Sequence, residues 1–347
     1  MKPDYTKRLF FLFTGMITII ALIYLQSILI PFVFAFILWF LIREVKTYLK
    51  KIKFVREKFP SWLLSSIASI LLLSALSLTI KLLTDNIQSL SSSLPVYQNT
   101  ISTITEKINA AFEIDLFAWL KDFSGEFDFA GILSRLFATL TSLFGNAFTV
   151  ILYLIFLILE ESGFSKKIKA IYPHPDEYQN ALHLIRKVEK SIGDYITLKT
   201  LVSVLTGFLS YIVLLIIGLD APIFWAFLIF LLNYIPTIGS LIATIFPATF
   251  ALLQFAEFTP AVLILLIVGS IQLIIGNIVE PKLMGNTLNI SSLVVLLALS
   301  FWGAIWGVTG MILSVPVTVI IVIICSEFES TRSVAIMLSE NGEIKKK

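Results

Sequence analysis

Long apolar stretches without charged side chains dominate the pattern along the chain. Residues 9–42 carry no charge over 34 positions, which suits two membrane-crossing helices with a turn around Gln26, Ser27 and Pro31. A helix needs about 20 predominantly apolar residues to cross the hydrocarbon core of a bilayer. Further stretches of suitable length predict single crossings at 61–83, 143–159, 200–218 and 261–279. The pattern predicts an all-α, polytopic membrane protein.

Two other apolar stretches, 222–254 and 290–325, do not fit one crossing each. Both exceed 30 residues, whereas two full crossings would need about 40. Proline and glycine interrupt the first within 233–240, and glycines interrupt the second within 303–310. Backbone outside a helix is tolerated at membrane depth only where protein or a wet cavity satisfies it. We predict two re-entrant helical hairpins; the alternative is two long, kinked single spans.

The two hairpins belong to a weak internal repeat. Gly218 precedes Gly239 by 21 residues and Gly285 precedes Gly307 by 22, and a proline follows eight or nine residues later. Each repeat would be a crossing helix followed by a hairpin, starting on opposite sides of the membrane. Inverted repeats of this kind are common in secondary transporters. The prediction is about eight membrane segments, with two re-entrant hairpins in an inverted repeat.

Composition agrees with a membrane protein. Hydrophobic residues make up 57% of the 347 residues and charged residues 14%, against about 25% charged in a soluble domain. One cysteine, Cys325, excludes a disulfide within the chain, and the two histidines lie in a polar stretch. We therefore predict neither a metal site nor a cofactor.

Basic residues set the predicted orientation, because they concentrate in cytoplasmic segments. They cluster at 2–8, 43–58, 166–199 and 345–347, whereas 84–142 has three basic residues against seven acidic ones. Both termini are predicted to be cytoplasmic and the 84–142 segment extracytoplasmic.

Two polar segments are predicted to form amphipathic helices. Those of the external segment would lie on the membrane surface or on a neighbouring subunit, or form a packed cap without chemistry. Outside, apolar residues repeat at helical spacing at Ile101, Ile104, Ile108 and Phe112, and again at Leu133, Leu136, Phe137 and Leu140. Inside, Pro175 is expected to start a helix at the inner leaflet. This helix also carries Glu189 and Asp194, so nucleic-acid binding is a poor alternative.

The predicted organisation has six parts. They are spans one to three with a basic loop (1–83), an external insert (84–142), span four (143–160), cytoplasmic amphipathic helices (161–198), an inverted-repeat transport region (199–325) and a cytoplasmic tail (326–347).

Neutral polar residues and glycines at the helix breaks form the candidate substrate site. Broken helices expose free N–H and C=O groups, which inverted-repeat transporters direct at their substrates. The candidate residues are Asn233, Pro236, Thr237, Gly239, Ser240, Gln272, Asn277, Gly307, Thr309 and Gly310. Gln272 and Asn277 need partners when buried, and neighbouring helices could equally supply them.

Four residues are candidate hinges: Pro247, Pro281, Gly303 and Pro316. Pro281 is expected to end the crossing helix and to leave Glu280 at the interface. There the carboxylate could couple transport to a proton or cation, although a solvated helix end is the more ordinary interpretation.

Three segments resemble the autoinducer-2 exporter family. The run from Asn233 to Gly239 resembles its Ile-Pro-x-x-Gly signature, the run from Gly276 to Gly285 contains Glu280-Pro281-Lys282, and the run from Gly303 to Pro316 resembles its last segment. The resemblance covers the whole chain in layout.

This resemblance implies a multi-pass protein of the cytoplasmic (inner) membrane that exports a small polar signalling molecule. It also implies a homo-oligomeric, pentameric ring and elevator-like movement; other members are described as sodium/proton antiporters or permeases. The chain departs from relatives at 272–276, where they often carry more polar residues, including an acid. That departure disfavours charge-coupled antiport.

The leading hypothesis is a secondary transporter or facilitator for a small polar solute, with membrane lipid around it. Sodium/proton antiport and an accessory permease or scaffold role are the alternatives. An enzyme is disfavoured because no paired Asp, HExxH or Ser/His constellation lies in a span. An ATP-driven pump is disfavoured because no Walker-type motif is present.

Overall fold

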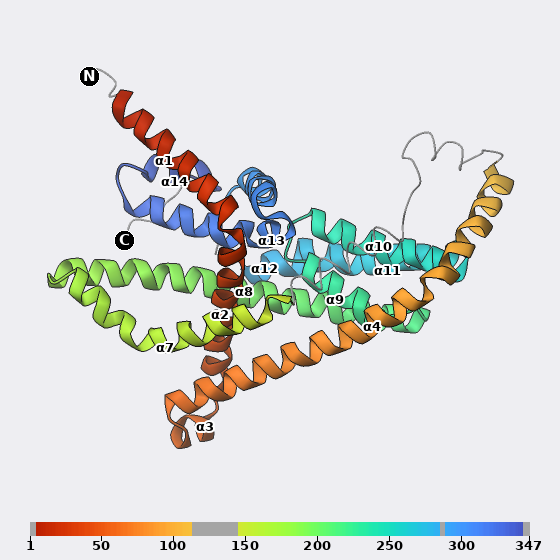
Figure 1. Cartoon of the computed structure of the whole chain (residues 1–347), viewed down its shortest axis with the longest axis horizontal. Helices are drawn as coiled ribbons and strands as arrows, with labels where there is room; N and C mark the ends of the chain where they lie inside the picture. The colour runs from red at the N-terminus through yellow and green to blue at the C-terminus, as the bar shows by residue number, and fades with distance from the viewer. Residues whose placement is uncertain (1–4, 113–144, 285–288, 343–347) are drawn as a thin grey trace. The chain divides into compact units, whose positions relative to one another are not determined.

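The computed structural model describes residues 5–112, 145–284 and 289–342, and every regular element in these ranges is helical (Figure 1). The helices are α1 (Tyr5–Tyr24), α2 (Gln26–Lys51), α3 (Lys53–Lys58), α4 (Ser61–Phe112), α7 (Ala147–Ile171), α8 (Pro175–Ile217), α9 (Pro222–Leu232), α10 (Ile238–Phe255), α11 (Phe258–Ile274), the π-helix η1 (Ile275–Val279), α12 (Glu280–Met284), α13 (Ser292–Glu327) and α14 (Arg332–Leu338). The predicted all-α class is confirmed for this part of the chain.

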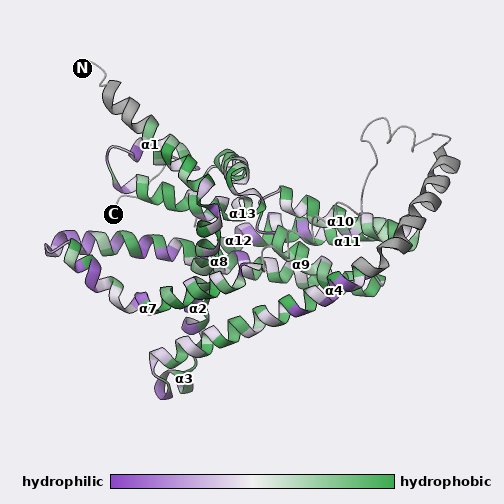
Figure 2. Cartoon of the chain, in the orientation of Figure 1, coloured by the Kyte–Doolittle hydropathy of each residue, from purple (hydrophilic) through white to green (hydrophobic). Residues whose placement is uncertain are grey.

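The apolar stretches form long helices. In the described residues six helices are long and apolar enough to cross a membrane, or seven if α7, which is bent, counts as one span. Figure 2 shows these helices as largely hydrophobic and the connection between α7 and α8 as hydrophilic. The chain is therefore an integral membrane protein; the finer count of eight segments stays a prediction.

The first two predicted spans are separate helices, α1 and α2, which break at Leu25. The predicted turn was too wide, because α2 begins at Gln26 and continues through Pro31 to Lys51. Pro31 lacks the N–H group for one backbone hydrogen bond. The helix nevertheless continues past this residue, whose side chain is buried.

Two helices are longer than predicted. α4 runs for 52 residues, so the predicted span at 61–83 and the apolar repeat from Ile101 to Phe112 lie on one helix. A straight helix of this length measures about 78 Å, more than twice the thickness of the hydrocarbon core. The second apolar repeat, at 133–140, lies outside the described residues.

Helix α8 begins at Pro175 with Asp176 and Glu177 in its first turn, as predicted. The helix has 43 residues and ends at Ile217, so the predicted cytoplasmic helix and the predicted span from residue 200 lie on one continuous helix; where it enters the membrane stays a prediction. The change from polar to apolar sequence does not itself end a helix. No proline interrupts the helix after Pro175. Gly193 faces the Phe40 ring, which would lie 3.6 Å from a Cβ atom added to this glycine.

The chain divides into two compact units. The first unit comprises Met1–Thr47, Asn146–Ile196 and Asn286–Lys347, and the second comprises Tyr48–Gly145 and Thr197–Gly285. Tryptophans from α13 build a core in the first unit, where Trp302 and Trp306 pack with apolar residues of α1 and α2. The Trp306 indole N–H donates to the backbone oxygen of Leu22 at 3.0 Å. The second unit contains the helix break at 233–237.

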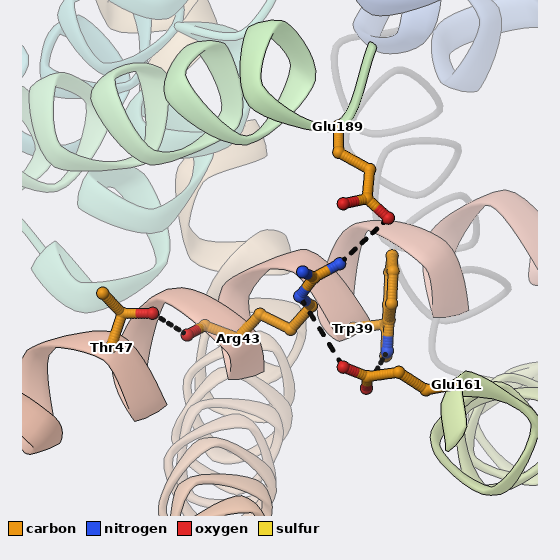
Figure 3. Close-up of polar contacts among 5 residues, drawn as sticks. All are labelled: Trp39, Arg43, Thr47, Glu161 and Glu189. Atoms are coloured by element: carbon orange, nitrogen blue, oxygen red, sulfur yellow. Dashed lines mark hydrogen bonds and ion pairs between the residues drawn. The ribbon is translucent and has the colours of Figure 1, made fainter. Parts of the chain in front are cut away.

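A polar cluster joins α2, α7 and α8 within the first unit (Figure 3). Arg43 pairs with Glu189 at 3.2 Å and with Glu161 at 3.9 Å, and its guanidinium lies 4.7 Å from the centre of the Trp39 ring. The Trp39 indole N–H donates to the second Glu161 oxygen at 3.1 Å. These four residues, the Arg43 cluster, connect three helices that lie far apart in the sequence. In the sequence alone, Arg43 indicates only the orientation of the chain in the membrane.

Helices α9 and α10 fold back on each other. Trp225, near the start of α9, packs against Phe250, near the end of α10, with their ring centroids 5.0 Å apart. At the other end, a methyl group on Gly239 would overlap the backbone oxygen of Leu232. The two helices are therefore antiparallel, with a tip at 233–237.

Helix α13 contains a similar reversal. Trp306 and Gly307 have non-helical backbone angles, and Gly307 has φ +60°. A methyl group on Gly310 would overlap the backbone oxygen of Trp302, and one on Gly303 would lie 3.0 Å from Met311. In a straight helix, residues eight apart are separated by about 12 Å along the axis. The two halves of α13 therefore fold back on each other. Re-entry into the membrane and an inverted relation to α9–α10 stay predictions.

Candidate functional site

A cavity of about 650 Å³ opens beside the break between α9 and α10 in the second unit. Four parts of this unit line it: the tip itself, one face of α10, one face of the α11–η1–α12 helix and a single residue of α8. We call it the tip cavity. Its lining residues are Lys199, Asn233, Ile235, Pro236, Thr237, Ser240, Leu241, Thr244, Ile245, Leu265, Gly269, Gln272, Leu273, Gly276, Asn277 and Glu280.

The tip has an unusual backbone. Thr237 has φ +61° and ψ −60°, and a positive φ is uncommon for residues other than glycine. Its hydroxyl-bearing side chain is exposed to the cavity, and its backbone oxygen accepts from the Ser240 hydroxyl at 2.9 Å. Such strained residues persist only where neighbours hold them, and they cluster at ligand sites. The strain at Thr237 therefore points to the tip as a binding element.

Two hydrogen bonds from α8 hold the tip in place. The buried Asn233 amide donates to the Ser203 hydroxyl at 3.1 Å. The Tyr234 and Thr200 hydroxyls are 2.7 Å apart. Thus two polar residues on the apolar half of α8, Thr200 and Ser203, hold the tip through hydrogen bonds.

Gln272 lines the cavity, and its side chain carries a buried acceptor without a hydrogen-bond partner among the described residues. Its Nε2 donates to the Thr244 hydroxyl at 2.8 Å, and Thr244 in turn donates to the backbone oxygen of Ser240 at 2.9 Å. Its Oε1 is buried and has no hydrogen-bond partner among the described residues. A buried polar atom without a partner costs free energy. A hydroxyl or N–H group of a ligand would remove that cost.

The lining face of α11 continues through η1 to α12. Gly269, Gln272, Gly276 and Glu280 follow one another at spacings of three or four residues, as on one face of a helix. Asn277 also lines the cavity, and its side-chain amide donates to the backbone oxygen of Leu273 at 3.1 Å. Local π-helix often occurs at functional sites.

The expectation that Pro281 ends this helix was wrong, because α12 runs from Glu280 to Met284. Proline lacks the N–H group for helical bonding and its ring clashes with the carbonyl four residues earlier, here that of Asn277. The wider π-turn over 275–279 lies where this clash would occur. The helix therefore continues past Pro281 to Met284.

Glu280 is consequently not a solvated helix end. It lines the tip cavity, and its carboxylate lies 2.5 Å from the ammonium of Lys199. Lys199 is 4% exposed. In the sequence alone, Lys199 is one of the basic residues that indicate the cytoplasmic side. Its pairing with Glu280 gives no sequence signal, because the two residues are 81 positions apart.

The structure brings most of the predicted site residues together around one cavity. Asn233, Pro236, Thr237, Ser240, Gln272, Asn277 and Glu280 all line the tip cavity. Gly239 instead packs against the end of α9. Gly307, Thr309 and Gly310 belong to the first unit and do not line this cavity, so their role in substrate binding stays a prediction.

The predicted hinges lie within regular or broken helix. Pro247 and Pro316 are buried inside α10 and α13, Pro281 lies in α12, and Gly303 lies in the first half of α13. Their movement stays a prediction. Among residues 5–112, 145–284 and 289–342, no three His, Cys, Asp or Glu side chains gather as metal ligands.

A set of membrane-length helices with a cavity that carries polar side chains at a helix break is typical of membrane transport proteins. Residues 9–330 match the AI-2E family transporter model, and the chain belongs to this family. It is 30% identical over 335 residues to the AI-2 transport protein TqsA of Escherichia coli, covering 94% of each chain. It is 31% identical to a putative transport protein of Borreliella burgdorferi, covering 90% of this chain and 85% of the relative. The resemblance noted from the sequence is confirmed, and the chain is a transporter rather than an enzyme.

Proposed function

We propose that the protein exports a small, uncharged polar solute of the autoinducer-2 type through the tip cavity. The buried, unpartnered Gln272 Oε1 at this cavity is the observation that carries the proposal. The family relative TqsA is named as an AI-2 transport protein, which supports the choice of solute.

The lining suits such a solute. A volume of about 650 Å³ falls in the usual range of small-molecule sites. Amides and hydroxyls from Asn233, Thr237, Ser240, Gln272 and Asn277 supply neutral hydrogen-bonding groups. The backbone at the broken tip adds free polar groups. Hydroxyl groups on a solute would exchange bonds with water for bonds with these groups.

We also propose how the site works in the membrane. Both hairpins are re-entrant and related as an inverted repeat, both termini are cytoplasmic, and the chain assembles as a pentamer. An elevator-like movement carries the tip cavity from the cytoplasmic to the external side of the inner membrane. The basic residues at both ends of the chain and the fold-back of α9–α10 and α13 support this arrangement.

Flux of labelled autoinducer-2 through purified protein in liposomes tests the function. We expect saturable flux above that of protein-free liposomes, and entry of the solute into everted vesicles, the movement that corresponds to export from the cell. Protein-dependent flux that is absent over a wide range of solute concentrations would contradict the proposal and favour an accessory or scaffold role.

A further inference from the structure

Two charged residues line the otherwise neutral tip cavity. Lys199 of α8 and Glu280 of α12 are the charged side chains among its described lining residues, and they face each other at 2.5 Å. Their side chains are 5% and 19% exposed. Both charges are thus removed from bulk water, and each has the other as its counter-ion.

The Lys199–Glu280 pair lies next to residues that hold or line the tip. Lys199 immediately precedes Thr200, whose hydroxyl contacts Tyr234 in the tip. Glu280 follows directly after the π-helix that carries Asn277. Burying an ammonium and a carboxylate is costly unless they are paired. Within a transport site, such a carboxylate is where a cotransported proton or metal cation would bind.

We propose that the Lys199 ammonium occupies the position of a coupling cation beside Glu280, so that transport is independent of sodium and proton gradients. The inference rests on the proposed transport function and assigns Lys199 a role in determining ion specificity. Because the tethered ammonium already neutralises the carboxylate, the site reaches electrical balance without taking up an ion. The protein is then a facilitator, and the antiport alternative is disfavoured.

Replacing Lys199 with an uncharged residue should leave a site beside Glu280 that can bind a metal cation. In Lys199→Met the Glu280 carboxylate keeps its place in the cavity lining but loses its counter-ion. Oxygen ligands suit hard cations, and any ion that binds only the folded state stabilises it. This variant is expected to bind sodium where the wild type does not.

Thermal unfolding in detergent at pH 8 tests this, with sodium chloride compared with choline chloride at equal ionic strength. Wild type and Lys199→Arg should unfold at the same temperature in both salts. Lys199→Met should unfold lower in choline and recover by about 2 °C or more in sodium. The double variant Lys199→Met with Glu280→Gln removes both charges and should be insensitive to the salt.

Sodium stabilisation of the wild type, or equal stabilisation of the double variant, would overturn the proposal. So would a folded Lys199→Met that is indifferent to sodium. If that variant does not fold, wild-type flux of labelled autoinducer-2 decides: it should be unchanged by an imposed sodium or pH gradient, and acceleration by either overturns the proposal. Absence of any flux would count against the transport function, whereas the unfolding measurements need no substrate.

Discussion

Gly239 and Gly310 occupy positions where a side chain cannot fit. Each lies against a backbone oxygen across a helix reversal, that of Leu232 in one case and that of Trp302 in the other. The sequence spacing had paired Gly239 with Gly307 in the repeat. The structure instead makes Gly310 the counterpart of Gly239, because each of these two glycines lies against a backbone oxygen. Gly307 and Thr237 both have a positive φ, +60° and +61°.

Replacing either close-contact glycine should therefore open its hairpin. We expect Gly239→Ala and Gly310→Ala each to lower the free energy of unfolding by about 1–3 kcal/mol, as other overpacked positions do. Gly276→Ala is the matched control, because nothing lies within 4 Å of its expected Cβ. Thermal unfolding in detergent is the measurement. Equal stability of Gly239→Ala and Gly276→Ala would contradict the tight tip.

At the scale of the elements, the sequence predicts helix breaks well and helix lengths poorly. Glycine and proline within apolar sequence signalled the reversals at 233–240 and 303–310, because both residues disturb helical bonding directly. The continuation of α4 and α8 was not predictable from hydropathy, since a helix can leave an apolar environment without a break. The pairing of Lys199 with Glu280 was missed because long-range packing creates it.

The Arg43 cluster is the clearest element-scale contact to test. Arg43→Ala removes the partner of Glu161 and Glu189 and should lower the free energy of unfolding by about 1 kcal/mol, since these side chains are about one-third exposed. Arg43→Lys should recover only part of this, because an ammonium cannot contact both carboxylates and the Trp39 ring in the same way. Lys166→Ala, at an exposed position on α7, should have no effect. Unfolding midpoints that are equal for all three would show that the cluster contributes nothing.

At the scale of the whole molecule, the sequence predicted the class and the family correctly, because composition and apolar length are properties of the entire chain. Membrane placement is the remaining prediction at this scale. Re-entrant hairpins place 255–260 outside and 280–289 inside, whereas two kinked single spans would reverse both.

Labelling of a single cysteine at position 257 distinguishes these topologies. Glu257 is exposed between α10 and α11, so Glu257→Cys in a Cys325→Ser background should react with an impermeant reagent. We expect modification from the external side of intact cells. Modification only from the cytoplasmic side would reject the re-entrant hairpins.

The central claim is that the tip cavity binds the transported solute through Gln272. Gln272→Leu removes the unpartnered acceptor, while Thr244 keeps its bond to Ser240, so the variant should fold. Ser270→Ala is the control, because Ser270 is exposed, does not line the cavity and donates within its own helix.

The decisive measurement is the flux of labelled autoinducer-2 in liposomes containing equal amounts of wild type, Gln272→Leu or Ser270→Ala. We predict that Gln272→Leu lowers flux at subsaturating solute about tenfold, the effect of losing a hydrogen bond worth about 1.4 kcal/mol, and that Ser270→Ala matches the wild type. Wild-type flux in Gln272→Leu would contradict the assignment of the tip cavity as the transport site.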